Sequence, residues 1–139
     1  MESRAEKSAP ERILGPLQGV RILVVEDDFF IAMELEAILT DAGGQVVGLC
    51  RTVKDALASA ATEDFAIALL DFRMGEETTI AVAQRLATRH VPFAFYTGQA
   101  QVEPLVVDWP DCKVVSKPAR PQTVINTLAD LLKRARASA

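Results

Sequence analysis

The sequence lacks the features that mark secreted, membrane-spanning and nucleic-acid-binding proteins. No apolar run reaches the roughly 18 residues that a membrane helix needs, and residues 1–11 are too polar for a secretion signal. Basic residues number 15 against 19 acidic ones, and the resulting formal charge of −4 argues against nucleic acid as the main partner. We therefore expect a cytoplasmic protein that binds neither nucleic acid nor a membrane.

Cysteine and histidine are also scarce, which excludes two kinds of site. The two cysteines, Cys50 and Cys112, lie far apart without CxxC spacing, and His90 is the single histidine. We interpret the cysteines as small buried residues in a reducing compartment. A zinc site is not supported, and the absence of a GxxxxGK[ST] loop gives no support to nucleotide binding of that kind.

The sequence does contain a regular alternation of short apolar runs and amphipathic stretches. The apolar runs predict strands at residues 20–25, 45–50, 65–70, 93–96 and 113–116. The amphipathic stretches predict a helix that ends at Gly43-Gly44, one that starts at Thr52, one from about 77 to 89, an irregular crossover at 99–111 and a last helix from Pro121. Such an alternation indicates an α/β protein, in which a parallel sheet is covered by helices on both faces.

The domain organisation follows from where this alternation begins and ends. Residues 1–19 combine mixed charges with Pro10, Gly15, Pro16 and Gly19, and we expect them to form a flexible leader, although Ile13, Leu14 and Leu17 could dock locally. Residues 20–137 then form one domain, since 139 residues are enough to enclose one hydrophobic core. Nothing after the last helix predicts an output domain.

Polar side chains stand at the carboxyl ends of four predicted strands, where sites gather in open α/β sheets. In chain order they are Glu26, Asp27 and Asp28 after the first strand, Asp71 after the third, Thr97 at the end of the fourth and Lys117 after the fifth. These side chains would converge in a doubly wound sheet with the flavodoxin-like order 2-1-3-4-5. For Asp28, a role as the cap of the following helix is an equally good interpretation.

Each of these residue types has a task in phosphoryl chemistry. Clustered carboxylates repel one another unless a cation neutralises them, and hard oxygen ligands favour Mg²⁺. A carboxylate such as Asp71 can act as a nucleophile toward a phosphoryl group. An ammonium at Lys117 and a hydroxyl at Thr97 would stabilise the charge on the transferred group.

Four segments resemble the signature blocks of bacterial response-regulator receiver domains, which have the CheY-like form of the flavodoxin-like fold. These segments are ILVVEDD (22–28), ALLDFRM (68–74), FAFYTG (93–98) and VVSKP (114–118). The resemblance implies that Asp71 accepts a phosphoryl group from the phosphohistidine of a sensor histidine kinase or of a histidine phosphotransfer protein. It also implies that Thr97 and Lys117 bind the phosphoryl oxygens and that the Lys117–Pro118 peptide is cis.

The same resemblance implies a Mg²⁺ site. Glu26 and Asp27 would be its acidic pair, with Asp27 the direct ligand, and Asp71 would be a further ligand. The backbone carbonyl of Arg73 would complete the protein's share of the metal shell.

Two departures from the family pattern bear on signalling. Many receivers carry an aromatic switch residue three positions before the lysine, where this chain has Val114. The fourth strand partly resembles the "FAT GUY" subgroup of single-domain receivers, which is linked to general stress signalling. Phe95, Thr97 and Gly98 match that subgroup's signature, whereas the signature's other positions, 96, 99 and 100, do not.

These features predict a stand-alone regulator and not an enzyme. It would promote only its own phosphorylation and dephosphorylation, and would act by binding a downstream protein target or by draining phosphate from a shared kinase. The alternative is a small Mg²⁺-dependent phosphatase with an aspartyl nucleophile. Its common pattern has a second Asp two residues after the nucleophile, where this chain has Arg73. A docking protein that no longer accepts phosphate is a third possibility, which the intact set of polar residues disfavours.

Overall fold

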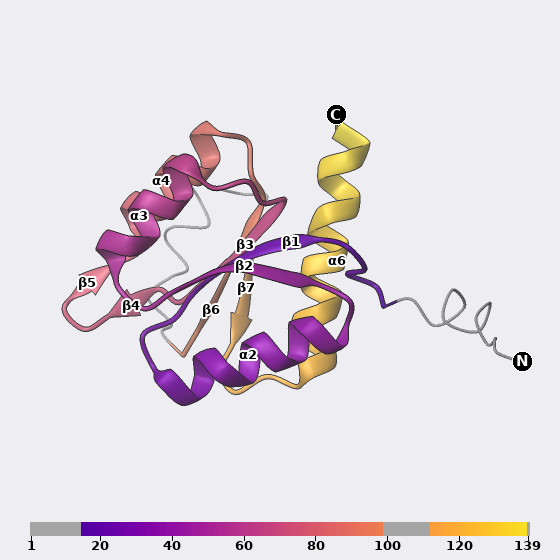
Figure 1. The fold of residues 1–139 in the computed structure, drawn as a ribbon, viewed down its shortest axis with the longest axis horizontal. Helices are drawn as coiled ribbons and strands as arrows, with labels where there is room; N and C mark the ends of the chain where they lie inside the picture. The colour runs from indigo at the N-terminus through magenta and orange to yellow at the C-terminus, as the bar shows by residue number, and fades with distance from the viewer. Residues whose placement is uncertain (1–14, 99–111, 139) are drawn as a thin grey trace, which may run out of the picture.

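The computed structural model describes residues 15–98 and 112–138, which form a five-stranded parallel sheet between two layers of helices (Figure 1). The strands are β1 (Arg21–Val25), β2 (Gln45–Cys50), β3 (Ile67–Leu70), β6 (Phe93–Thr97) and β7 (Lys113–Ser116). Their order in the sheet is β2-β1-β3-β6-β7, and every neighbouring pair is parallel. This is the flavodoxin-like, CheY-like order 2-1-3-4-5, so the predicted fold is confirmed.

Helices cover both faces of the sheet because each strand sends alternate side chains to opposite sides. The helices are α2 (Phe29–Asp41) and α6 (Pro121–Ser138) on one face, and α3 (Val53–Thr62) and α4 (Ile80–Thr88) on the other. In β1, Ile22 and Val24 belong to the layer under α2 and α6, whereas Leu23 and Val25 belong to the layer under α3 and α4. The central strands β3 and β6 are buried along their whole length, as continuous apolar runs predict.

Two helices begin at the capping residues that the sequence contains. The side chain of Asp28 accepts a hydrogen bond from the Ile31 amide (3.0 Å) at the start of α2. Thr52 does the same for the Asp55 amide (3.1 Å) at the start of α3. Each cap satisfies an amide that has no partner within the helix, and Asp28 therefore has the capping role that its position allowed.

The predicted start of the helix at residue 77 is wrong by three residues. Residues Glu77–Thr78 form a short strand, β5, which pairs with β4 (Arg73–Met74) in an antiparallel ribbon that turns at Gly75. The helix starts only at Ile80, because Thr79 is tied to the end of β3. Its hydroxyl donates to the carbonyl of Asp71 (2.6 Å), and its amide donates to the carbonyl of Phe72 (2.9 Å).

The flexible leader predicted over residues 1–19 does not include its carboxyl end, where the local docking allowed for Leu17 is observed. Leu17 is fully buried, and its amide donates to the carbonyl of Ala42 (3.1 Å). The Gly19 amide likewise donates to Gly43 (2.9 Å), so the packed core begins before residue 20. The predictions for residues 1–14 and 99–111 lie outside the described residues. Within the described ranges, no helix is both long and apolar enough to span a membrane.

Candidate functional site

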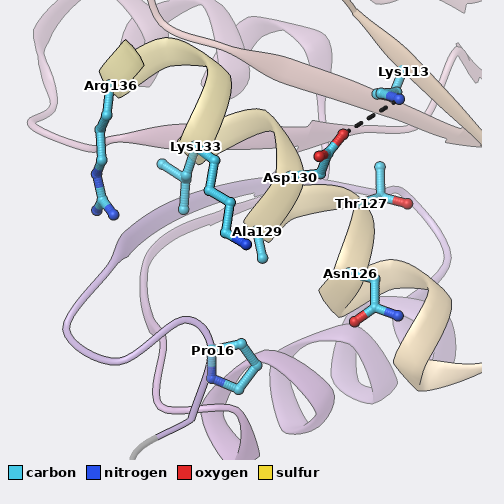
Figure 2. Close-up of a pocket in the computed structure, with 9 residues that line it drawn as sticks. Pro16, Lys113, Asn126, Thr127, Ala129, Asp130, Lys133 and Arg136 are labelled. Atoms are coloured by element: carbon cyan, nitrogen blue, oxygen red, sulfur yellow. Dashed lines mark ion pairs between the residues drawn. The ribbon is translucent and has the colours of Figure 1, made fainter.

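A groove with a volume of about 680 Å³ lies between α6 and the segment before β1 (Figure 2). Pro16, Lys113 and residues of α6 between Asn126 and Arg136 line it, and Lys113 forms an ion pair with Asp130 (3.4 Å). Because Lys113 is the first residue of β7, the groove lies toward the amino ends of the strands. It contains none of the polar residues that follow the strand ends, so the candidate site lies elsewhere.

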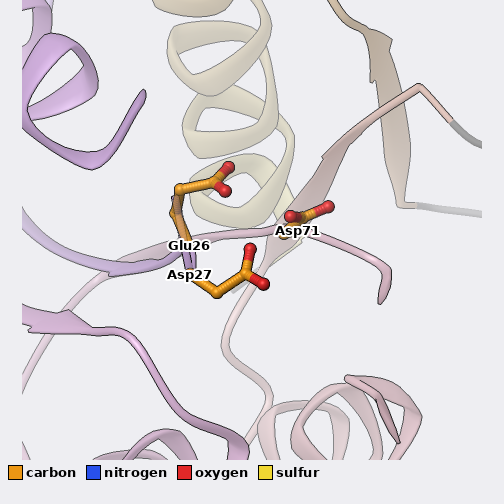
Figure 3. Close-up of side chains that lie close together, drawn as sticks. All are labelled: Glu26, Asp27 and Asp71. Carbon is orange, nitrogen blue, oxygen red and sulfur yellow. The ribbon is translucent and has the colours of Figure 1, made fainter. Parts of the chain in front are cut away.

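The acidic residues converge at the opposite, carboxyl edge of the sheet (Figure 3). Glu26 and Asp27 follow β1, and Asp71 follows β3, the strand beside it in the sheet. The Asp71 amide donates to the carbonyl of Val25 (2.8 Å), which extends the ladder between these strands to the start of the site. One carboxylate oxygen from each acidic residue lies within 4.8 Å of the others. The structure thus brings together the three carboxylates that the sequence predicted.

Lys117 enters this acidic cluster from the end of β7. Its Nζ lies 2.8 Å from Oε1 of Glu26 and 3.3 Å from Oδ2 of Asp71. The backbone reaches this position through the ladder, because the Lys117 amide donates to the carbonyl of Thr97 (3.1 Å). The Lys117–Pro118 peptide is cis, as predicted. The lysine and two of the three carboxylates therefore form one hydrogen-bonded group.

Thr97 and Arg73 are the other two predicted site residues. Thr97 is buried at the end of β6 and pairs with Ser116, the residue before Lys117. Arg73 is exposed in β4, two residues after Asp71, where it pairs with Thr78. The role of the Thr97 hydroxyl and that of the Arg73 carbonyl stay predictions.

Burial determines the electrostatics of the carboxylates. Only 1% of Glu26 and 7% of Asp71 is exposed. Burial raises the pKa of Glu26 to about 7, against the lowering effect of the hydrogen bonds from Lys117 and from the Asp28 amide. Burial also raises the pKa of Asp71, although the charge of Lys117 opposes the shift. Both carboxyl groups therefore hold a proton more tightly than they would in water.

The pKa of Lys117 is also raised, but here burial opposes the shift and the carboxylates cause it. Burial alone would lower its pKa, but the hydrogen bond to Glu26 and the charge of Asp71 outweigh that effect and raise it. The cluster of three carboxylates thus contains one ammonium, which contacts two of them, and this leaves an excess of negative charge. Carboxylate oxygens at this spacing suit a small hard cation, so the residues present fit Mg²⁺.

Three further residues, whose roles were not predicted from the sequence, support the site. The Thr79 hydroxyl holds the carbonyl of Asp71, as described above. Nη2 of Arg51 donates to the carbonyl of Asp27 (3.2 Å). The ring of Tyr96 lies against Lys117, with its centroid 5.4 Å from Nζ. Arg51 directly follows β2, so an inspection of all five strand ends would have found it.

Comparison with known proteins identifies the family. The sequence model of the family described as the response regulator receiver domain matches residues 22–129. The chain is 30% identical over 125 residues to the Phyllosphere-induced regulator PhyR of Methylorubrum extorquens, a match that covers 87% of this chain and 46% of that protein.

Solved structures agree with this result. A CheY-like response regulator receiver domain protein from Methanospirillum hungatei superposes with a TM-score of 0.77 at 24% identity, over 88% of this chain and all of that one. The response regulator PhyR from Brucella abortus superposes with a TM-score of 0.75 at 27% identity, over 94% of this chain and 54% of that one. The chain spans about half the length of the PhyR proteins that it matches.

Proposed function

Since the chain belongs to the response regulator receiver domain family, we propose that it accepts a phosphoryl group on Asp71 as a step in a phosphorelay. One observation carries the proposal. Asp71 directly follows the central strand β3, buried beside two further carboxylates and in contact with the ammonium of Lys117. No neighbouring carboxylate combines this contact with a position at the end of the strand in the middle of the sheet.

The proposed reaction is a transfer from phosphohistidine to a carboxylate. An oxygen of Asp71 forms a bond to phosphorus while the P–N bond breaks, and the imidazole keeps the electron pair of that bond and takes up a proton. The product is an acyl phosphate, which water later hydrolyses. The Lys117 ammonium and the Thr97 hydroxyl would stabilise the negative charge on the phosphoryl oxygens as the group arrives.

Glu26, Asp27, Asp71 and the carbonyl of Arg73 would hold Mg²⁺ for this reaction. The bound ion supplies positive charge that neutralises the carboxylates and the incoming phosphoryl group. Arg51 and Thr79 support two of these residues, because they hold the backbone carbonyls of Asp27 and Asp71. The same hydrogen bonds fix the chain on both sides of the site.

The phosphodonor is, in this proposal, a sensor histidine kinase or a histidine phosphotransfer protein. Phe29, Phe30 and Met33 form an apolar patch at the start of α2, and 80% of Phe30 is exposed. The patch begins two residues after Asp27, so it lies next to the acidic cluster in the chain. A protein that presents a phosphohistidine to Asp71 would have to cover this surface, and we assign the patch to that donor.

The chain would act as a cytoplasmic regulator and not as an enzyme on other substrates. Arg73 occupies the position where the common aspartyl phosphatases have a second Asp, which supports this assignment. Its output would be contact with a downstream protein or the removal of phosphate from a shared kinase. Turnover of a simple phosphate ester would contradict the regulator assignment.

The test is incubation with acetyl phosphate and Mg²⁺, followed by intact-protein mass spectrometry. We expect one added phosphoryl group in the wild type and none in Asp71→Asn. Asp28→Asn is the matched control, because it changes a neighbouring carboxylate that caps α2, and it should be labelled like the wild type. Labelling of Asp71→Asn at the wild-type rate would overturn the proposal.

A further inference from the structure

The ammonium of Lys117 is held on three sides. Glu26 contacts it at 2.8 Å and Asp71 at 3.3 Å. The third contact is the face of the Tyr96 ring, whose centroid lies 5.4 Å from Nζ. This separation is inside the limit of about 6 Å at which an aromatic ring attracts a cation.

The ring of Tyr96 is held rigidly in the core, whereas the side chain of Lys117 is flexible. Only 6% of Tyr96 is exposed, and its side chain belongs to the apolar layer between the sheet and helices α2 and α6. Its strand neighbour in the ladder is Val115, in the middle of β7. Lys117, by contrast, carries its charge on a flexible four-carbon stem. The position of the ammonium therefore depends on what surrounds it.

The three contacts differ in what the proposed reaction does to them. Phosphorylation would turn the carboxylate of Asp71 into an acyl phosphate, so that the negative charge would lie on the phosphoryl oxygens and no longer on the carboxylate that Lys117 contacts. A cation bound by the acidic cluster would weaken the attraction between Glu26 and Lys117. The Tyr96 ring is neither a metal ligand nor a reacting group, so it is the one contact that these steps leave unchanged.

We propose that Tyr96 is a positioning residue that holds the ammonium of Lys117 beside the phosphoryl site through the face of its ring. The inference rests on the proposed function of Asp71. The ring keeps Lys117 in place when the carboxylates are engaged by a cation, which is the state in which the phosphoryl group arrives. The phenol hydroxyl has no part in this role.

The experiment lowers the electron density on the face of the ring and keeps the shape of the ring. Tyr96 is replaced by Phe and by phenylalanines with one, two and three ring fluorines, which withdraw electron density from the ring face. Tyr96→Phe, which keeps the face of the ring, is the reference for the fluorine series. With Mg²⁺ in excess, labelling should then slow stepwise with each fluorine, by about 3- to 10-fold in total. A flat series would overturn the inference.

Phe95 provides a matched control on the same strand. Its ring is fully buried in the opposite layer, where it packs against Phe72 and Phe93. The same fluorine series at Phe95 should leave the rate of labelling unchanged. Equal slowing at both positions would mean that fluorine acts through the core and would also overturn the inference.

A second measurement separates this inference from the proposed function. Reductive methylation of Lys117, followed by peptide mass spectrometry, needs no phosphorylation and proceeds through the neutral amine, so its rate rises when the contact that holds the ammonium is weakened. It should become faster along the fluorine series at Tyr96 and stay constant along that at Phe95. If the wild type is not labelled at Asp71, the proposed function fails, while the methylation rates still test the contact. If the wild type is labelled but the rate of labelling stays flat along the Tyr96 series, the inference fails and the proposed function stands.

Discussion

The body of the sheet and its carboxyl edge bury different kinds of side chain. The inner strands β3 and β6 are buried along their length and carry almost only apolar side chains. The buried polar residues of the described chain all lie at the carboxyl edge: Glu26, Asp71, Thr79 and Thr97. Burial of apolar groups stabilises a fold, whereas burial of carboxylates costs free energy unless they are paired.

This difference separates stability from chemistry within one sheet. The edge contains one ammonium for three carboxylates, and the raised pKa of Glu26 shows that this pairing does not offset the cost of burial. The apolar body must therefore supply the free energy that keeps the edge folded in the absence of a cation. Substitutions in the two regions should then have opposite signs, and the following predictions test that contrast.

The largest loss of stability is expected in the body of the sheet. Ile67 is fully buried in β3, four residues before Asp71. Ile67→Ala should lower the free energy of unfolding by about 2–5 kcal/mol, because it removes buried apolar area and leaves a cavity. Urea denaturation measures the change. The rate of Asp71 labelling per folded molecule should stay within about twofold of the wild-type rate. A loss of unfolding free energy below about 1 kcal/mol would contradict the contrast between the body of the sheet and its edge.

At the edge, removal of a charge should stabilise the metal-free protein. The pKa of Glu26 is raised from 4.5 to about 7 in the folded state. A raised pKa means that the folded protein binds the proton more tightly than the unfolded chain. The corresponding stability is present below about pH 4.5 and is lost as the pH rises toward 7. The raised pKa of Asp71 acts in the same direction.

Glu26→Gln removes this titration and keeps an oxygen that accepts hydrogen bonds. At pH 8, with a chelator present, the variant should unfold with a free energy roughly 1–3 kcal/mol higher than that of the wild type. The advantage should shrink as the pH falls to about 5, and urea denaturation at both pH values measures it. If the difference between the two proteins does not change with pH, burial of Glu26 does not carry the cost that we assign to it.

Mg²⁺ should distinguish two adjacent carboxylates. Asp27 belongs to the cluster of three, whereas the carboxylate of Asp28 caps α2. Asp27→Asn should weaken Mg²⁺ binding at least about tenfold, or about 1.4 kcal/mol, while Asp28→Asn should change it less than about twofold. Isothermal titration calorimetry measures both. Equal losses would show that the metal is not held by the carboxylates that the geometry brings together.

The sequence predicts the body of the sheet better than the segments that attach to it. Continuous apolar runs indicate strands that are buried on both faces. The residues that follow those runs lie at the carboxyl edge of the sheet. The cluster of Glu26, Asp27 and Asp71 could therefore be predicted. The start of α4 could not, because it depends on the hydrogen bond between Thr79 and the carbonyl of Asp71. That contact joins two segments whose pairing no local pattern encodes.

The partners in contacts between segments far apart in the sequence were equally hard to predict. Leu17 stands among glycines and prolines that resemble a linker, and its burial depends on docking against Ala42. The contact of Tyr96 with Lys117 requires the register of β6 against β7 and one side-chain conformation at each residue. Periodicity predicts which face a residue occupies, but not which atom it meets there.

The smallest effect on folding is expected at Phe30, on the surface beside the edge. Since 80% of this residue is exposed, Phe30→Ala should change the free energy of unfolding by less than about 0.5 kcal/mol. Labelling by acetyl phosphate should also stay at the wild-type rate, because this small donor needs only the carboxylate site. Val114→Ala is the matched control, an exposed apolar residue on β7 outside the patch.

A protein donor should behave differently, because it has to cover the entrance to the site. The donor used in this test is the phosphorylated histidine phosphotransfer domain or kinase domain that labels the wild type fastest within a panel of such domains. Its transfer rate to Phe30→Ala should fall about tenfold or more, as expected when an exposed aromatic anchors an interface. Its transfer rate to Val114→Ala should not change. Equal rates for all three proteins would place the donor on another face and leave the patch at the start of α2 unassigned.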